Sequence, residues 1–238
     1  TAASAIGRSG FIPFDEKKGA FAESFTRNFV ALNLSQYPES LIESELFGHR
    51  KGAFTGAIEN YEGVLARCRP HGAILLDEIG DVSVPVQIKL LQVLQERTFV
   101  VVGSHEKKRF RGRVIAATNK PVADLRRTGR FREDFYYRLC SDVLEVPPLR
   151  QRLAEEPAEM DDLLSLLLRR MFQEPPRDLL SEVRRTIERD LGPAYPWTGN
   201  VRELEQAVRR IILTGCYPGD ARANGEDLLG RLIEGVQA

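Results

Sequence analysis

The feature that most constrains this chain is a short apolar run that ends in two adjacent carboxylates. Four apolar residues, Ala73-Ile74-Leu75-Leu76, are followed directly by Asp77 and Glu78. A run of this length without a polar residue is typical of a strand buried on both faces, as in a parallel sheet. We therefore expect both carboxylates at the carboxyl end of a central strand, where open α/β sheets bind ligands.

Further runs of the same kind alternate with helical patterns. The additional strand-like runs cover residues 29–33, 98–102 and 113–117, and the helical patterns between them cover residues 39–47 and 84–97. Strands that alternate with helices predict a parallel α/β sheet flanked by helices.

The chain changes character after Pro147-Pro148, where only helical, leucine-rich patterns follow. This change predicts an α/β domain over residues 1–149, a small all-helical domain over 150–216 and a short tail over 217–238. Residues 11–28 mix Pro, Gly, Lys and Phe without a clear period, and they are left unassigned.

The charge balance argues against a general attraction to nucleic acid or to an anionic membrane. The 34 Lys and Arg residues equal the 34 Asp and Glu residues, so the formal net charge is +0. The apolar runs are too short to span a bilayer, and no signal-peptide pattern opens the chain, so we expect a cytoplasmic protein without membrane contact. Three widely spaced cysteines indicate neither a disulfide framework nor a zinc site.

Polar side chains at the ends of the predicted strands can support phosphoryl transfer. Asp77 can hold the hydration shell of a magnesium ion while Glu78 orients an attacking water. The amides of Asn33 and Asn119 can hydrogen-bond a phosphate oxygen or a water. Each feature also has a plainer interpretation, because acidic residues favour helix N-termini and a lone Asn after a strand is usually a turn residue. The pattern alone leaves both interpretations open.

A loop bracketed by glycines is the second distinctive pattern. In Gly52-Ala53-Phe54-Thr55-Gly56-Ala57 the glycines permit a tight reversal that can present Phe54 to solvent. The alternative is a hairpin whose Phe is buried in the core, which is the commoner arrangement in general. A hexapeptide of this composition nevertheless favours a dedicated loop.

In this order, the motifs resemble the AAA+ domain of the sigma-54-dependent transcriptional activators, also called bacterial enhancer-binding proteins. The segments that carry the resemblance are 45–57, 72–80, 117–119, 131–139, 147–150 and 197–204. The resemblance implies a parallel sheet of the P-loop NTPase type, flanked by helices, and a small all-α lid.

The resemblance implies that ATP and Mg²⁺ bind at the strand ends. Asp77 matches the Walker B residue that supports the metal, with water between them, and Glu78 matches the residue that activates water. Asn33 matches the asparagine that restrains this glutamate, and Asn119 matches sensor I.

Three arginines and two loops receive roles from the same resemblance. Arg132 and Arg138 match arginine fingers that reach the nucleotide of a neighbouring subunit, and Arg202 matches sensor II, which reaches the nucleotide of its own subunit. The loop 52–57 matches the one that grips the sigma factor, and residues 103–111 match the second pore loop. For each arginine the plain alternative is a surface ion pair.

The function that the resemblance implies is an ATPase that remodels the closed complex of sigma-54 RNA polymerase into an open one. Copies of the chain are expected to form a ring, a hexamer in the family, and to reach promoter or enhancer DNA through a domain outside this chain. The alternative is a homologue that binds the sigma factor but does not hydrolyse nucleotide.

The sequence departs from the family pattern in two places. No GxxxxGK(S/T) phosphate loop occurs in the 238 residues. Because residues 3–6 resemble the helix that follows this loop in the family, we expect the Walker A lysine immediately before Thr1. Residues 11–28 and the loop 104–108 resemble the regulators of the RNA-repair (rtc) operon within the family.

Overall fold

The computed structural model describes residues 14–21 and 29–219, arranged as two compact units, Thr1–Leu144 and Glu145–Ala238. The division lies a few residues before the expected boundary at 149/150. Residues 145–148, between this division and the first helix of the second unit, form no helix or strand, and Leu144 and Val146 are exposed. The first helix of the second unit begins at Leu149. Each unit is described by itself.

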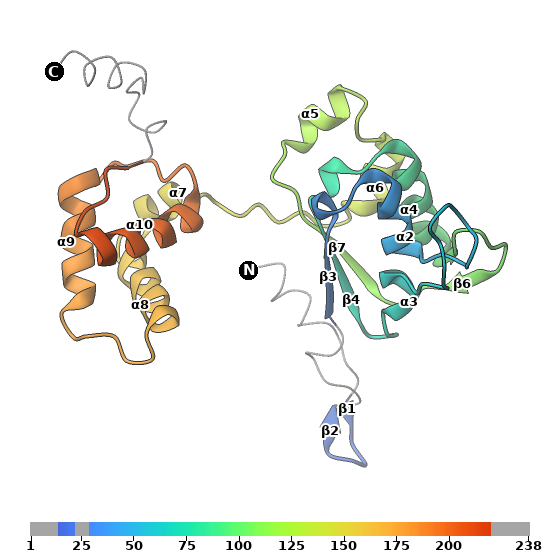
Figure 1. Cartoon of the computed structure of the whole chain (residues 1–238), viewed down its shortest axis with the longest axis horizontal. Coiled ribbons are helices and arrows are strands. Elements are labelled where there is room, and N and C mark those ends of the chain that lie inside the picture. The colour runs from blue at the N-terminus through green and yellow to red at the C-terminus, as the bar shows by residue number, and fades with distance from the viewer. Residues whose placement is uncertain (1–13, 22–28, 220–238) are drawn as a thin grey trace. The chain divides into compact units, whose positions relative to one another are not determined.

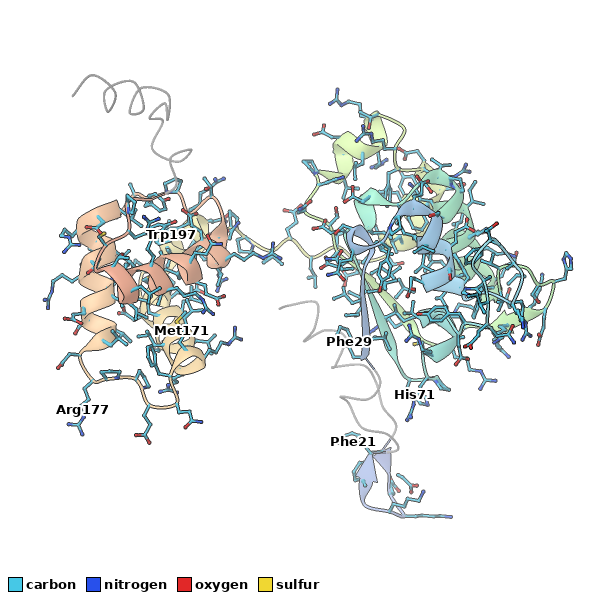
Figure 2. The ribbon with its side chains drawn as sticks, viewed as in Figure 1. Phe21, Phe29, His71, Met171, Arg177 and Trp197 are labelled. Carbon is cyan, nitrogen blue, oxygen red and sulfur yellow. The ribbon has the colours of Figure 1, made fainter. Side chains whose placement is uncertain are left out.

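The first unit is built on a parallel sheet in the order β3-β4-β7, whose strands are β3 (Phe29–Asn33), β4 (Ala73–Asp77) and β7 (Arg113–Ala116) (Figure 1). The central strand β4 is buried over its first four residues, as its uniform apolar character predicts. Phe29 and His71, labelled in Figure 2, mark the amino ends of β3 and β4. The predicted parallel α/β sheet is confirmed.

Helices flank this sheet and supply most of its core. They are α2 (Glu39–Phe47), α3 (Val64–Arg67), α4 (Val84–Glu96), α5 (Val122–Arg127) and α6 (Glu133–Leu139), with the single 3-10 turns η1 (Leu34–Gln36) and η2 (Ile79–Asp81). Leu46, Ile74, Val93 and Phe135 are fully buried in one cluster. Helices α4 and α6 are in contact, and this contact determines where the residues just before α6 lie.

The expectation that residues 98–102 join the parallel sheet is wrong. Residues Thr98–Val100 form β5, which pairs antiparallel with β6 (Lys107–Arg109) in a separate two-stranded sheet. The turn between them is short enough to close a hairpin, which a parallel partner would not allow. Within the unassigned segment, β1 (Phe14–Asp15) and β2 (Ala20–Phe21) also pair antiparallel.

The second unit contains four helices within its described residues: α7 (Leu149–Glu155), α8 (Glu159–Met171), α9 (Leu179–Leu191) and α10 (Asn200–Thr214). Leu164, Val183 and Leu204 are fully buried at its centre, and Trp197 (Figure 2) packs edge to face against Tyr195 with ring centroids 5.0 Å apart. The all-helical character predicted after Pro147-Pro148 is observed. None of the helices in the described part of the chain is both long and apolar enough to cross a membrane.

Candidate functional site

The strand ends bring the predicted polar residues to one edge of the sheet. Asn33 and Asp77 are register partners at the carboxyl ends of β3 and β4. On the other side of β4, the Ala117 N–H donates to the Leu76 carbonyl at 2.9 Å, and Asn119 follows shortly after. Asp77 therefore lies between the segments that carry the two asparagines, at the edge where parallel α/β sheets bind ligands.

Glu78 is held in an unusual conformation immediately beyond this edge. Its φ of 57° and ψ of 43° place it in the left-handed region, at the start of η2, where a non-glycine residue costs roughly 1–2 kcal/mol. The Ile79 N–H donates to the Ala117 carbonyl at 3.0 Å, and the Glu78 N–H donates to Asp77 Oδ1 at 3.1 Å. These two hydrogen bonds fix the backbone on both sides of the turn.

The carboxylate of Glu78 lacks one hydrogen-bond partner. Its Oε2 atom is buried and unpaired, the one such side-chain atom among the described residues. A buried polar atom left without a partner costs about 1–3 kcal/mol. A carboxylate kept in this state beside Asp77 fits a site that admits a water molecule and a hydrated Mg²⁺, because both offer the donors that the oxygen lacks.

Asn33 has a local partner at this edge. Its Oδ1 accepts hydrogen bonds from the Ser35 N–H at 3.0 Å and from the Ser35 hydroxyl at 2.7 Å, which caps η1. Among the hydrogen bonds of the described residues, none joins Asn33 to Glu78. The restraint of Glu78 by Asn33 stays a prediction.

The segment around Asn119 packs closely on the turn that follows Glu78. Asn119 itself is exposed. A Cβ added at Gly80 would lie 2.8 Å from Thr118 Oγ1, so this approach requires a glycine. The Lys120 ammonium forms an ion pair with Asp81, the last residue of η2. Sequence reasoning missed this pair because its members lie far apart in the chain.

Arg132 is half-exposed and held by its own helix. Its guanidinium donates two hydrogen bonds to Asp134, at 3.0 and 2.7 Å. These bonds raise the pKa of Arg132 and lower the pKa of Asp134 from their ordinary values. An exposed pair of this kind contributes little to stability and can exchange for another anion.

Arg138 and Arg202 have different surroundings. Arg138 donates from Nε and one terminal nitrogen to the Leu94 carbonyl, at 3.2 and 3.1 Å. This carbonyl lies in the last turn of α4, where helix carbonyls have no partner within the helix. Arg202 is exposed in the first turn of α10, in the second unit. The structure therefore brings Asn33, Asp77 and Glu78 together, while Arg202 belongs to the other unit.

The glycine-bracketed loop is an ordered turn whose tip is exposed. The Gly52 N–H donates to the Ala57 carbonyl at 2.8 Å, and the Ala57 N–H donates to the Phe54 carbonyl at 3.0 Å. Gly52 and Gly56 have φ of 81° and 99°, which favours glycine at both positions. Phe54 is 37% exposed and Thr55 is exposed. The tip thus faces solvent, and the alternative of a core Phe is wrong.

Aromatic residues anchor the base of this loop. The ring of His49 packs edge to face against Phe54 at 4.9 Å and stacks on Tyr61 at 5.6 Å. Its Nδ1 lies 2.6 Å from the buried Ser44 hydroxyl of α2. Burial and the hydrogen bond to Glu45 raise the pKa of Tyr61. The sequence pattern did not single out His49 or Tyr61 as partners of the loop, although His49 lies three residues before Gly52.

The segment after β5 contacts the loop from the other side. The Arg50 N–H donates to the Val102 carbonyl at 2.9 Å, and the Arg50 side chain pairs with Glu106 at 2.9 Å. A Cβ added at Gly103 would lie only 2.6 Å from the Cβ of Ala53. The two loops that the sequence singled out are therefore one contiguous surface.

Comparison with known proteins is consistent with this geometry. The model of the sigma-54 interaction domain matches residues 17–145, more than half of the chain, and this range includes the strand ends, the loop and Arg132 and Arg138. The chain belongs to the sigma-54 interaction domain family.

Curated relatives of this family member are bacterial regulators. The chain is 44% identical over 193 residues to the DNA-binding transcriptional regulator NtrC of Rhizobium meliloti (81% of this chain, 38% of that protein). It is 42% identical over 190 residues to the Nif-specific regulatory protein of Azotobacter vinelandii (79% and 34%). The chain thus spans less than half the length of these relatives.

Solved structures show the same fold. NtrX from Brucella abortus in complex with ADP aligns with a TM-score of 0.63 and 26% identity, over 82% of this chain and 43% of that chain. NtrX crystallised in complex with ATP aligns with a TM-score of 0.62 and 27% identity, over 81% and 40%. This sigma-54 interaction domain therefore shares its architecture with proteins whose crystals contain adenine nucleotides.

Proposed function

We propose that this chain is the part of a sigma-54-dependent activator that hydrolyses ATP and uses the energy to remodel sigma-54 RNA polymerase at a promoter. The observation that carries the proposal is the unpaired, buried carboxylate oxygen of Glu78 beside Asp77 at the carboxyl edge of the sheet. Membership of the family and the exposed loop 52–57 support it.

At the strand ends, each residue has a distinct task in this proposal. Asp77 holds the water shell of Mg²⁺, which supplies positive charge to the phosphate oxygens. Glu78 accepts a hydrogen bond from the attacking water and orients it. Asn119 hydrogen-bonds a phosphate oxygen or the water, and Asn33 restrains Glu78 until the nucleotide is in place.

The arginines complete the site between subunits. Arg132 and Arg138 of one subunit stabilise charge on the nucleotide of its neighbour, an effect that is worth about 10³–10⁵ in rate when an arginine acts in trans. Arg202 reaches the nucleotide of its own subunit from the helical domain. This arrangement requires a ring of identical subunits, for which a hexamer is proposed, in the cytoplasm.

The loop 52–57 transmits hydrolysis to the polymerase. Phe54 and Thr55 form its tip, and the close approach of Ala53 to Gly103, with the contacts of Arg50 to Val102 and Glu106, links the tip to the rest of the α/β unit. DNA binding belongs to another part of the protein, in keeping with the zero net charge of this chain.

The test separates ATP hydrolysis from the action of the loop 52–57 on the polymerase. With the full-length protein, Thr55→Ala is expected to retain ATP hydrolysis and to lose open-complex formation on a sigma-54 promoter. Ile58→Ala, at a position that is 75% exposed and lies just outside the loop, serves as the matched control and retains both activities. Open-complex formation by Thr55→Ala at the wild-type level would refute the role of the loop. A wild-type protein that binds the sigma factor without hydrolysing ATP would favour a binding module instead.

A narrower proposal concerns the regulon. The resemblance of residues 11–28 and 104–108 to the regulators of the RNA-repair operon supports a protein of that subfamily. The measurement is in vitro transcription from the RNA-repair promoter against a nitrogen-regulated sigma-54 promoter. Equal activity on both promoters would remove this proposal and leave the broader one intact.

A further inference from the structure

Helix α4 carries a polar side chain in the middle of the core. Gln87 is 0% exposed. Its Nε2 donates to the Val82 carbonyl at 3.0 Å and to the Arg130 carbonyl at 2.7 Å, and its Oε1 accepts from the Arg132 N–H at 3.0 Å. Both amide hydrogens and the carbonyl oxygen are therefore engaged, all three with backbone groups.

These three hydrogen bonds join two segments that carry predicted site residues. Val82 directly follows η2, the turn that begins after Glu78. Arg130 and Arg132 flank Phe131, which is 4% exposed and packs at 5.1 Å against Phe135 of α6. Arg132 is the N-cap residue of α6. The Gln87 side chain thus links Val82, four residues after Glu78, to the backbone of Arg130 and Arg132.

An apolar residue would fill this space without the cost of burying an amide. The amide instead satisfies backbone groups that no helix or strand partner reaches, because Arg130 and Arg132 lie before the first turn of α6. The backbone of Arg132 is therefore fixed from inside the core, while its side chain stays half-exposed and is held only by the exchangeable pair with Asp134.

We propose that Gln87 is a positioning residue for Arg132: its amide fixes the backbone from which the Arg132 guanidinium reaches the nucleotide of the neighbouring subunit. The inference rests on the proposed ATPase function and names a determinant of its rate. Because Gln87 itself touches neither nucleotide nor neighbour in this scheme, it acts entirely through the placement of Arg132.

The variant that tests the proposal is Gln87→Met in the full-length protein. Methionine keeps the unbranched shape and most of the volume but forms none of the three hydrogen bonds. A displacement of about 1 Å can lower a rate about 10²-fold, so kcat is expected to fall by about 10- to 100-fold. The KM for ATP is expected to stay unchanged, because Arg132 acts in the transition state and not in ground-state binding. Gln95→Met, at an exposed position of the same helix, is the matched control.

Mixed rings decide whether Gln87 acts through Arg132 or through Glu78. Glu78→Gln subunits have no activating carboxylate but carry an intact Arg132. Mixed with Gln87→Met subunits, they should restore hydrolysis, because intact Glu78 of the Gln87→Met subunit then faces an intact Arg132 of its neighbour. Mixing Gln87→Met with Arg132→Ala subunits should restore nothing. The reverse pattern would show that Gln87 acts through Val82 on Glu78 and would overturn the proposal.

The remaining outcomes are also decisive. A wild-type kcat in Gln87→Met, or a rise in KM equal to the loss of kcat/KM, refutes the positioning role while the proposed ATPase function stands. If Gln87→Met does not form soluble rings, Gln87→Leu replaces it. Failure of both variants to fold makes Gln87 a determinant of folding and overturns the inference. A wild-type protein without ATP hydrolysis refutes both the inference and the function on which it rests.

Discussion

Replacing Gly103 by alanine tests whether the loop 52–57 depends on its contact with the segment after β5. Gly103 has a φ of 76°, at which a side chain costs about 1–2 kcal/mol. The new Cβ would lie 2.6 Å from the Cβ and 3.1 Å from the Cα of Ala53, so the two segments must separate by roughly 1 Å to reach ordinary carbon contact. Such overpacking typically costs about 1–3 kcal/mol. We expect Gly103→Ala to lower the free energy of unfolding by about 2–5 kcal/mol.

Gly129 provides the matched control for the backbone cost. Its φ is 68°, and a Cβ there meets nothing within 4 Å. Gly129→Ala should therefore show only the conformational penalty of about 1–2 kcal/mol. Denaturant unfolding of both variants isolates the contact with Ala53 as the difference. Open-complex assays should show Gly103→Ala impaired beyond any loss of ATP hydrolysis, and Gly129→Ala unimpaired. Equal destabilisation of the two variants, or full activation by Gly103→Ala, would refute the link between the two loops.

Two further predictions concern single titratable groups. Burial raises the pKa of the Cys68 thiol to about 11, so iodoacetamide at about pH 8 should label Cys68 on the order of 100-fold more slowly than free cysteine in solution. Peptide mass spectrometry measures the labelling, and a rate equal to that of free cysteine would contradict the prediction. Hydrogen bonds from the Arg189 side chain and from the Tyr217 N–H hold the pKa of Asp190 below its usual range. The ionised Asp190 therefore stabilises the fold above the unfolded pKa of about 3.9, and this contribution is lost as the pH falls through the lower folded pKa. Asp190→Asn should therefore reduce the free energy of unfolding by up to about 1 kcal/mol at about pH 7, and a difference from wild type that persists at about pH 2 would be contrary to this sign.

The sheet could be predicted from the sequence because its strands are continuous apolar runs. β4 is buried over its first four residues, whereas β3, at the end of the strand order, has Leu32 as its one buried residue. Both are nevertheless apolar runs, and the polar residue after each run marks the carboxyl end of the strand. Residues 98–102 were assigned to the wrong sheet because strand propensity does not specify a partner. The partner, Lys107–Arg109, is a charged strand that no apolar pattern reveals.

Helix α4 contains a buried polar residue that the apolar periodicity of its sequence does not predict. The apolar pattern of residues 84–97 includes Ile88, and it gives no reason to bury Gln87. The structure has Gln87 at 0% and Ile88 at 48% exposure. The reason is a set of backbone groups at Val82, Arg130 and Arg132, two of them more than forty positions away along the chain. A sequence pattern contains no information about such distant partners.

The geometry of the candidate site also depends on contacts between residues that are far apart in the chain. The sequence predicted the position of Asp77 and Glu78 at the end of a buried strand, while their role in hydrolysis stays a prediction. The left-handed backbone of Glu78 and its unpaired Oε2 depend on the Ile79–Ala117 hydrogen bond, which forms only when β4 and β7 pair.

The most direct test of the central claim is ATP hydrolysis by the full-length protein, wild type against Glu78→Gln, with nucleotide binding measured on the same preparations. The substitution preserves the shape of the side chain and removes the charge that orients the attacking water. We expect wild-type affinity for ATP and a loss of hydrolysis of about 10²-fold or more. Hydrolysis by Glu78→Gln at the wild-type rate would contradict the assignment of Glu78 as the residue that activates water.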